Sequence, residues 1–307
     1  MRGIRRSALG AALLTLSLIA AACGEEQPGG GGGEDGGDVK QVTVGAVGFA
    51  ENQIVAEMYA QVLENAGFEV EKQLTLESRE VLQPAIEGGD IDIAPEYLSS
   101  LLLFLDPESE ASGDPEAVRD QLEPLLEDQG QTLLESAEAN DTNALVVTQE
   151  TADEFGLTTT SDLAPVAGDL VLGGPPECPE RPFCLPGFDE TYGIEFGDFK
   201  PLDVGGPLTV EALDNGEIDV ALLFSTSPVV ADKGWVFLED DQALQSTENI
   251  TPVVSNEVLN DEIEGLLNEV SATIAQEVIL ELNGRVETGG ADPALVAQAH
   301  LNDEGLL

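Results

Sequence analysis

The sequence predicts an α/β protein built from two similar lobes, and three observations support this fold class. Strand-like and helix-like segments alternate along the chain, which is typical of parallel sheets covered by helices on both faces. A ten-residue pattern occurs twice, far apart in the sequence. The chain has 307 residues, which is enough for two medium-sized domains.

The alternation of elements is clearest just after position 40. Residues 41–45 predict a short buried strand, and residues 51–66 predict a helix with one apolar face that ends at Gly67. Residues 68–74 alternate in polarity as a second strand does. Three further elements are predicted: a helix that Ser78 caps and that ends at Gly88-Gly89 despite Pro84, a strand over 91–94, and a helix from Asp114-Pro115 to about Gly130.

The repeated pattern is the most informative feature of this chain. Residues 85–94 read AIEGGDIDIA and residues 212–221 read ALDNGEIDVA, with identity at five of ten positions. Each copy reads as a helix end, a glycine-containing turn and a strand that begins Ile-Asp. Coincidence is the alternative, because such turns are common. Since each copy follows its own strand and helix, we interpret them as two α/β lobes with a ligand between them.

The amino terminus predicts export. Three arginines precede an uncharged, mostly apolar run over residues 8–22, which is too short to span a membrane but suits a signal peptide. The run ends in Ala-Ala-Ala-Cys-Gly and resembles a bacterial lipobox, although Ala20 stands where Leu is usual. We therefore expect a signal peptide over 1–22, lipidation of Cys23, and a flexible glycine-rich tether over 23–39. An ordinary signal peptide followed by an incidental cysteine is the alternative. The expected location is the extracytoplasmic face of the cell membrane.

The charge balance excludes one class of partner. The formal net charge is −49, with 60 acidic and 11 basic residues, so nucleic acid would be repelled. An acidic surface is typical of proteins that stay soluble in high salt, where self-repulsion is screened. A generally acidic proteome is the alternative explanation.

Cysteine usage and motif searches favour a binding protein over a metalloprotein or an enzyme. Cys178 and Cys184 are close in sequence and outside the cytoplasm, which predicts a local disulfide. A zinc site is the alternative, but the only histidine is His300. The chain has no Gly-x-Ser-x-Gly, no His-Glu-x-x-His and no phosphate-binding loop with lysine. We predict no catalysis, no cofactor and no metal. A hydrolase based on paired carboxylates remains the enzymatic alternative.

Six segments, collinear over nearly the whole chain after position 40, carry a family resemblance. They are VGAVGFAENQIVAEMYAQVLENAGFEV, GDIDIAPEYLSS, TADEFGLTTTSDLAPVAGDLVLGG, ERPFCLPGFDETYGIEF, EALDNGEIDVALLFSTSP and DPALVAQAHLNDEGLL. With them the chain resembles the type II periplasmic binding proteins of ABC importers. It is most similar to the osmoprotectant group, which carries glycine betaine, carnitine or choline.

The resemblance implies a two-lobed fold with mostly parallel sheets and two crossover strands that act as a hinge. It places the first lobe at 40–142 plus 250–307 and the second at 143–249. It also implies a monomer that closes on a small solute and delivers it to the permease subunits and their ATPase. Two alternatives keep the fold: another polar or amphipathic solute, or a ligand sensor that does not transport.

The family holds quaternary ammonium groups in a cage of aromatic rings, through cation–π attraction. The motifs place the cage positions at Ala94, Asn143, Phe224 and Glu248 or Asn249, so that only Phe224 is aromatic. Loss of three aromatic faces, at about 1 kcal/mol each, would weaken the affinity for a quaternary ammonium group about a hundredfold. Candidate substitutes are Phe49, Tyr97, Phe183 and Trp235.

Polar candidates complete the predicted site. Glu51 and Asn52 lie with Phe49 where the first strand gives way to a helix with free backbone amides, although capping and packing explain them equally well. Arg79 begins the next helix, where a surface role is the alternative. Arg181 lies in a loop where the family binds carboxylates with arginine, and Glu177 is its neighbour or its ion-pair partner. The predicted ligand-binding residues are Phe49, Glu51, Asn52, Arg79, Tyr97, Asn143, Glu177, Arg181, Phe224, and the hydroxyls of Ser225 and Thr226.

Overall fold

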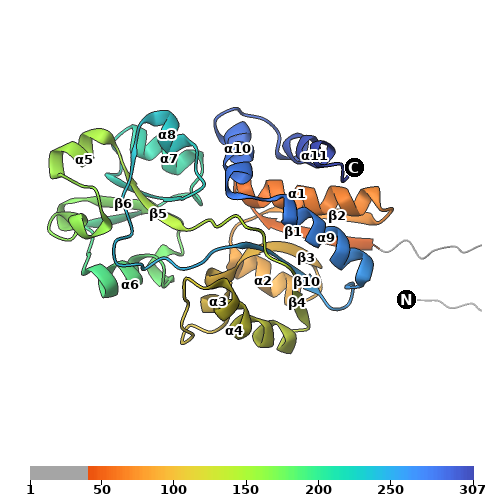
Figure 1. Cartoon of the computed structure of the whole chain (residues 1–307). Helices are drawn as coiled ribbons and strands as arrows, with labels where there is room; N and C mark the ends of the chain where they lie inside the picture. The colour runs from red at the N-terminus through yellow and green to blue at the C-terminus, as the bar shows by residue number, and fades with distance from the viewer. Residues whose placement is uncertain (1–40) are drawn as a thin grey trace, which may run out of the picture. The chain divides into compact units, whose positions relative to one another are not determined.

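A computed structural model describes residues 41–307, and their strands form two five-stranded sheets (Figure 1). The predicted signal peptide, Cys23 and the glycine-rich tether lie outside the described residues. In spatial order the first sheet contains β2 (Glu69–Leu76), β1 (Gln41–Val47), β3 (Ile93–Tyr97), β10 (Ile250–Ser255) and β4 (Gln131–Leu133). The second contains β7 (Asp198–Pro201), β6 (Val171–Gly174), β8 (Val220–Phe224), β5 (Asn143–Val147) and β9 (Val236–Phe237).

The two sheets share one topology. β1 pairs in parallel with β2 and β3, and β10 is antiparallel to β3 and β4. In the same way β6 pairs in parallel with β7 and β8, and β5 is antiparallel to β8 and β9. Each sheet therefore has four parallel strands and one reversed strand, in the same place. This confirms the predicted fold class.

Helices cover both sheets. Around the first sheet lie α1 (Ala50–Asn65), α2 (Arg79–Glu87), α3 (Leu98–Leu105), α4 (Pro115–Asp128), α9 (Asp261–Thr273), α10 (Gln276–Glu287) and α11 (Pro293–Glu304). Around the second lie α5 (Gln149–Phe155), α6 (Leu185–Gly187), α7 (Pro207–Asp214), α8 (Val229–Lys233) and the short turns η1 (Thr160–Leu163), η2 (Ala167–Asp169), η3 (Cys178–Glu180) and η4 (Phe188–Tyr192). We call each sheet with its helices the first half and the second half of the fold.

Each half has its own hydrophobic core. α1 buries the apolar face that its sequence predicts, with Ile54, Val55 and Met58 fully inaccessible to solvent. Burial of one such side chain contributes about 1.5–3 kcal/mol. α1 ends before Gly67, whose φ of 93° is readily adopted by glycine alone. The apolar clusters of the first half and those of the second half share no residue.

Two connections join the halves and run side by side. The outgoing connection covers residues 134–142 and the returning connection covers residues 238–249. Asn140 and Asn249 form an antiparallel bridge, and the amide of Asp141 donates to the carbonyl of Glu248 at 3.0 Å. Figure 1 shows the two segments crossing together between the sheets. The lobe boundaries at 142/143 and 249/250 stay a prediction.

The repeated sequence pattern forms the same turn twice. In the first half the Asp92 carboxylate accepts from the amide of Thr43 at 2.7 Å, and in the second the Asp219 carboxylate accepts from the amide of Val171 at 2.9 Å. Each aspartate therefore ties the start of its strand to the strand beside it. Gly89 and Gly216 supply the positive φ that both turns need. β3 begins at Ile93 rather than Ile91, because Ile91 and Asp92 belong to this turn.

Two predicted helix starts have different outcomes. Asp114 caps α4 as predicted and accepts from the amide of Glu116 at 3.2 Å. Ser78 occupies the predicted cap position of α2, although its hydroxyl accepts no hydrogen bond from a backbone amide of the helix. Within residues 41–307 no helix is long and apolar enough to cross a membrane.

The predicted disulfide is confirmed. Cys178 and Cys184 are bonded, their Cα atoms are 5.2 Å apart, and both are almost completely buried. The bridge closes the short loop that carries Arg181 and Phe183.

We expect the Cys178→Ser, Cys184→Ser double variant to lose about 2 kcal/mol of unfolding free energy. A crosslink that closes so short a loop removes little chain entropy from the unfolded state. Urea unfolding of the oxidised protein, the reduced protein and the variant will measure this loss. Equal midpoints for all three would contradict the prediction.

Candidate functional site

A cavity of about 310 Å³ lies where strands of both sheets end. Its walls include Val47 at the end of β1, Tyr97 at the end of β3 and Phe224 at the end of β8. Asn143 begins the reversed strand β5 and therefore lies at the same edge. The carboxyl edge of parallel strands is where α/β proteins commonly bind ligands. The two Ile-Asp turns lie at the opposite ends of β3 and β8.

Most of the predicted site residues line this cavity. They are Phe49, Asn52, Arg79, Tyr97, Asn143, Glu177, Arg181 and Phe224. That each of them contacts solute stays a prediction.

Three predicted residues lie outside the cavity lining. Glu51 is 2% exposed, and its carboxyl group accepts hydrogen bonds from Tyr97, Thr226 and Asn283 behind the wall. Thr226 is 1% exposed and belongs to the same buried cluster. The Ser225 hydroxyl accepts from the amide of Thr142 at 3.0 Å and faces a second, shallower cavity. Local hydrogen bonds thus hold these three side chains outside the cavity lining, where the sequence had placed solute contacts.

Aromatic side chains form much of the cavity wall. The ring of Phe49 lies 5.3 Å from that of Phe224 and 6.0 Å from that of Tyr97, centroid to centroid. Phe104 and Phe183 complete the aromatic lining. Trp235 does not line the cavity. It packs against the hydrophobic core of the second half, and the ammonium group of Lys233 lies 5.9 Å from the centre of its ring.

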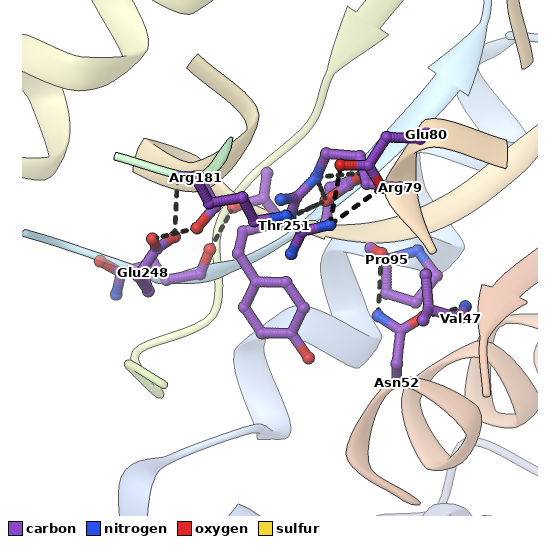
Figure 2. Close-up of polar contacts among 12 residues, drawn as sticks. Val47, Asn52, Arg79, Glu80, Pro95, Arg181, Glu248 and Thr251 are labelled. Atoms are coloured by element: carbon purple, nitrogen blue, oxygen red, sulfur yellow. Dashed lines mark hydrogen bonds and ion pairs between the residues drawn. The ribbon is translucent and has the colours of Figure 1, made fainter. Parts of the chain in front are cut away.

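Arg79 forms a buried ion pair with Glu96 in the cavity wall. Its Nε lies 3.0 Å from both carboxylate oxygens, and its Nη2 donates to Oε2 at 2.7 Å. Their side chains are 10% and 3% exposed. Burial has the largest single effect and lowers the pKa of Arg79, but the charge and hydrogen bonds of Glu96, together with the charges of Glu248 and Glu80, raise that pKa overall. Figure 2 shows the guanidinium of Arg79 with its ion-pair contacts.

Arg181 links the two halves at the cavity. Its Nη2 donates to Glu80 of α2 at 3.0 Å and to Glu177 at 3.2 Å. Glu177, just before Cys178, and Arg181, inside the disulfide-closed loop, belong to the second half, whereas Glu80 belongs to the first. Glu177 is thus both an ion-pair partner and a lining residue. The pair with Glu80 is partly exposed, so it contributes little to stability on its own.

Glu248 lies on the returning connection, at a position where the resemblance implies an aromatic ring. Its carboxyl group accepts from both the amide and the hydroxyl of Ser100. Burial raises the pKa of Glu248 to about 7. Glu248 therefore changes charge near neutral pH.

Asn52 fixes the edges of two strands beside the cavity. Its Oδ1 accepts from the amide of Val47 at 2.8 Å, and its Nδ2 donates to the carbonyl of Pro95 at 3.0 Å (Figure 2). Because both contacts are to backbone groups, Asn52 positions the ends of β1 and β3.

The lining is strongly acidic. It contains six carboxyl groups, from Glu80, Glu96, Asp141, Glu177, Glu180 and Glu248, but only the guanidinium groups of Arg79 and Arg181. Both guanidiniums are already paired with carboxylates of the protein. Aromatic faces together with excess negative charge suit a small cation. Among residues 41–307, no group of three or more His, Cys, Asp or Glu side chains is arranged to hold a metal ion.

Sequence reasoning missed several lining residues. Glu96 lies next to Tyr97 in the segment GDIDIAPEYLSS, and Phe104 lies on the apolar segment 98–105, whose composition is typical of a buried core. The others that were not predicted as ligand contacts are Val47, Ser78, Glu80, Pro95, Ser100, Leu103, Pro107, Asp141, Glu180, Pro182, Phe183, Val204 and Glu248. The sequence indicated Phe183 only as a substitute for a missing aromatic face, and Glu248 only as a position where the family has an aromatic ring.

Comparison with known families gives a match over almost the whole described chain. The profile described as the substrate binding domain of the ABC-type glycine betaine transport system matches residues 40–303. The chain belongs to this family. Its members are solute-binding proteins of ABC importers that act outside the cytoplasm, and the family is not one of enzymes.

Individual relatives agree with this assignment. The carnitine transport binding protein OpuCC of Listeria monocytogenes is 29% identical over 295 residues, which cover 94% of this chain and 93% of the relative. The glycine betaine-binding protein YehZ of Escherichia coli strain K12 is 27% identical and covers 86% of this chain and 90% of its own length. A solved glycine betaine/carnitine/choline ABC transporter structure superimposes with a TM-score of 0.67 at 28% identity, covering 86% of this chain and 99% of that chain.

Proposed function

We propose that this protein captures a small quaternary ammonium solute in the cavity between its two halves and delivers it to an ABC permease. The observation that carries the proposal is the lining itself, in which aromatic rings and excess carboxylates surround one cavity. A quaternary ammonium has no N–H donor, so aromatic faces and unpaired negative charge are the groups that attract it. The rings of Phe49 and Phe224 lie closest together and supply the central faces.

The charge balance favours a solute with net positive charge. A zwitterion such as glycine betaine needs a cation for its carboxylate. The two arginines of the lining already form ion pairs with the protein: Arg79 with Glu96, and Arg181 with Glu80 and Glu177. A choline-like cation needs no such partner. We therefore expect choline to bind more tightly than glycine betaine.

The mechanism that we propose is closure of two lobes about the two connections. The first lobe comprises residues 40–142 and 250–307, and the second comprises residues 143–249. Solute would contact both lobes and shift their equilibrium toward the closed arrangement. Arg181 supports this, because it pairs with a carboxylate of each half. The protein would act as a monomer that binds solute without turnover.

The predicted attachment to the membrane is part of the same proposal. Lipidation of Cys23 would hold the protein beside the permease on the extracytoplasmic face, and the glycine-rich tether would let it reach its partner. Mass spectrometry of the membrane-extracted protein, with Cys23→Ala as the comparison, tests this attachment separately from solute binding.

Calorimetric titration of the protein with choline, glycine betaine, carnitine and a neutral polyol tests the proposed ligand. We expect saturable heats with the quaternary amines and none with the polyol. Binding to none of the quaternary amines would overturn the proposed ligand class, while a tighter complex with glycine betaine than with choline would overturn the charge argument.

Glu248→Gln gives a pH-dependent prediction. Above about pH 7 the wild-type carboxylate is ionised, so removal of its charge will weaken choline binding about fivefold, or about 1 kcal/mol. Below that pH the wild-type group is itself neutral, so the ratio of the two affinities will approach one. Titrations at about pH 6 and about pH 8.5 measure the ratio. Glu281→Gln, an exposed carboxyl on α10, is the matched control. A ratio that does not change with pH would contradict this role of Glu248.

A further inference from the structure

A buried hydrogen-bond cluster behind the cavity joins the two halves. Thr226 follows β8 in the second half, whereas Glu51 lies in the first turn of α1 in the first half. Asp141 lies on the outgoing connection between them. All three side chains are at least 95% buried. Asp141 also belongs to the cavity lining, whereas Glu51 and Thr226 lie behind it.

The distances in the cluster require an additional proton. The Thr226 hydroxyl oxygen lies 2.7 Å from Oε2 of Glu51 and 2.6 Å from Oδ1 of Asp141. A threonine hydroxyl has one proton, so it can donate to only one carboxylate. The other contact is a hydrogen bond only if that carboxyl group is itself protonated and donates to the hydroxyl oxygen.

The remaining partners cannot replace this proton. Tyr97 donates to Oε1 of Glu51 at 2.9 Å, and the side-chain amide of Asn283 on α10 donates to Oε2 at 2.8 Å. The Thr226 amide donates to Asp141 at 3.2 Å. None of these neutral donors cancels a full charge, and two ionised carboxylates so close together in a buried site are strongly disfavoured.

The electrostatic surroundings agree with a shared proton. Burial first and mutual interaction second raise the pKa of Asp141 well above its usual range, and burial raises the pKa of Glu51. The other titratable groups that face the pair are Tyr97 of β3 and Glu287 of α10, whose pKa values are also raised, by burial and then by repulsion from Glu51. Within residues 41–307, no lysine or arginine is among the main groups that act on either carboxyl.

We propose that Glu51 and Asp141 share one proton through the Thr226 hydroxyl, and that this proton belongs to the contact between the two halves. When α1 separates from the Thr226 turn, water reaches both carboxyl groups and the proton leaves. Capture of solute, which brings the halves together under the function proposed above, then takes up a proton. The contact is complete at low pH and is lost as pH rises through the raised pKa values.

An unfolding experiment tests the shared proton without any solute. The Glu51→Gln amide can donate to the Thr226 oxygen, so this variant needs no additional proton, although its nitrogen can no longer accept from Asn283. As pH rises, the wild type loses the stabilising effect of the shared proton, whereas Glu51→Gln does not. The ratio of the unfolding equilibrium constants, wild type over Glu51→Gln, will therefore rise by up to tenfold per pH unit between about pH 5 and about pH 9. Glu281→Gln, exposed on α10, will show a ratio that does not change with pH. Asp141→Asn provides a second variant if Glu51→Gln fails to fold.

Titration with choline chloride in two buffers of different ionisation enthalpy tests the link to solute capture. We expect proton uptake by the wild type and less by Glu51→Gln. Ionisation of Glu248 beside a bound cation would release protons and offset this uptake, so the titrations are run at about pH 8.5, where Glu248 is already ionised. A pH-independent unfolding ratio overturns the shared proton, and choline binding without proton uptake overturns its link to the contact between halves. If choline produces no heat, the proposed ligand fails, while the unfolding ratio still decides the shared proton.

Discussion

Replacement of Arg79 with methionine will lower the free energy of unfolding by about 3–5 kcal/mol. The variant leaves the Glu96 carboxylate, 3% exposed, without its ion-pair partner in the wall of the cavity. Loss of one partner of a buried pair is costly because the remaining charge stays away from water. Urea unfolding followed by circular dichroism measures the loss.

Two further variants distinguish this explanation from a loss of packing. The double variant Arg79→Met, Glu96→Gln removes both charges of this pair and keeps an acceptor for the amide of Tyr97, so it will regain most of the stability. Lys233→Met breaks an exposed ion pair with Asp214 and will cost less than about 1 kcal/mol. No recovery in the double variant would show that the charge of Glu96 is not the cause.

The second large effect will follow the removal of two aromatic rings. The Phe49→Ala, Phe224→Ala variant will bind choline about a hundredfold more weakly, because each desolvated cation–π contact contributes on the order of 1–2 kcal/mol. Phe155→Ala, which removes an exposed ring from α5, will bind as the wild type does. Melting curves show whether the double variant is folded. Unchanged affinity in a folded double variant would place the solute elsewhere.

The fold could be predicted because its signals are local. The Ile-Asp turns repeat a glycine, an aspartate and a strand start within ten residues, and these groups contact one another and the neighbouring strand. The apolar face of α1 is equally local, since its residues recur at helical spacing. The disulfide could be predicted because the two cysteines are only six positions apart.

The site could be predicted only in part because its contacts are not local. Glu51 was expected to face the solute, yet it shares a helix face with Ile54, Val55 and Met58, and this spacing was a signal for burial. The partner of Arg79 is 17 positions away, and Glu80 and Arg181 are 101 positions apart. No pattern within a window of sequence shows which of sixty acids a given arginine will meet.

The two connections carry residues with more than one task. Asp141 and Glu248 lie on the segments that join the sheets, and both also line the cavity. A bend in either segment therefore changes the shape and the charge of the recognition surface at the same moment. Under the proposed closure, substitutions at these positions will change both which compound is preferred and how fast it is released.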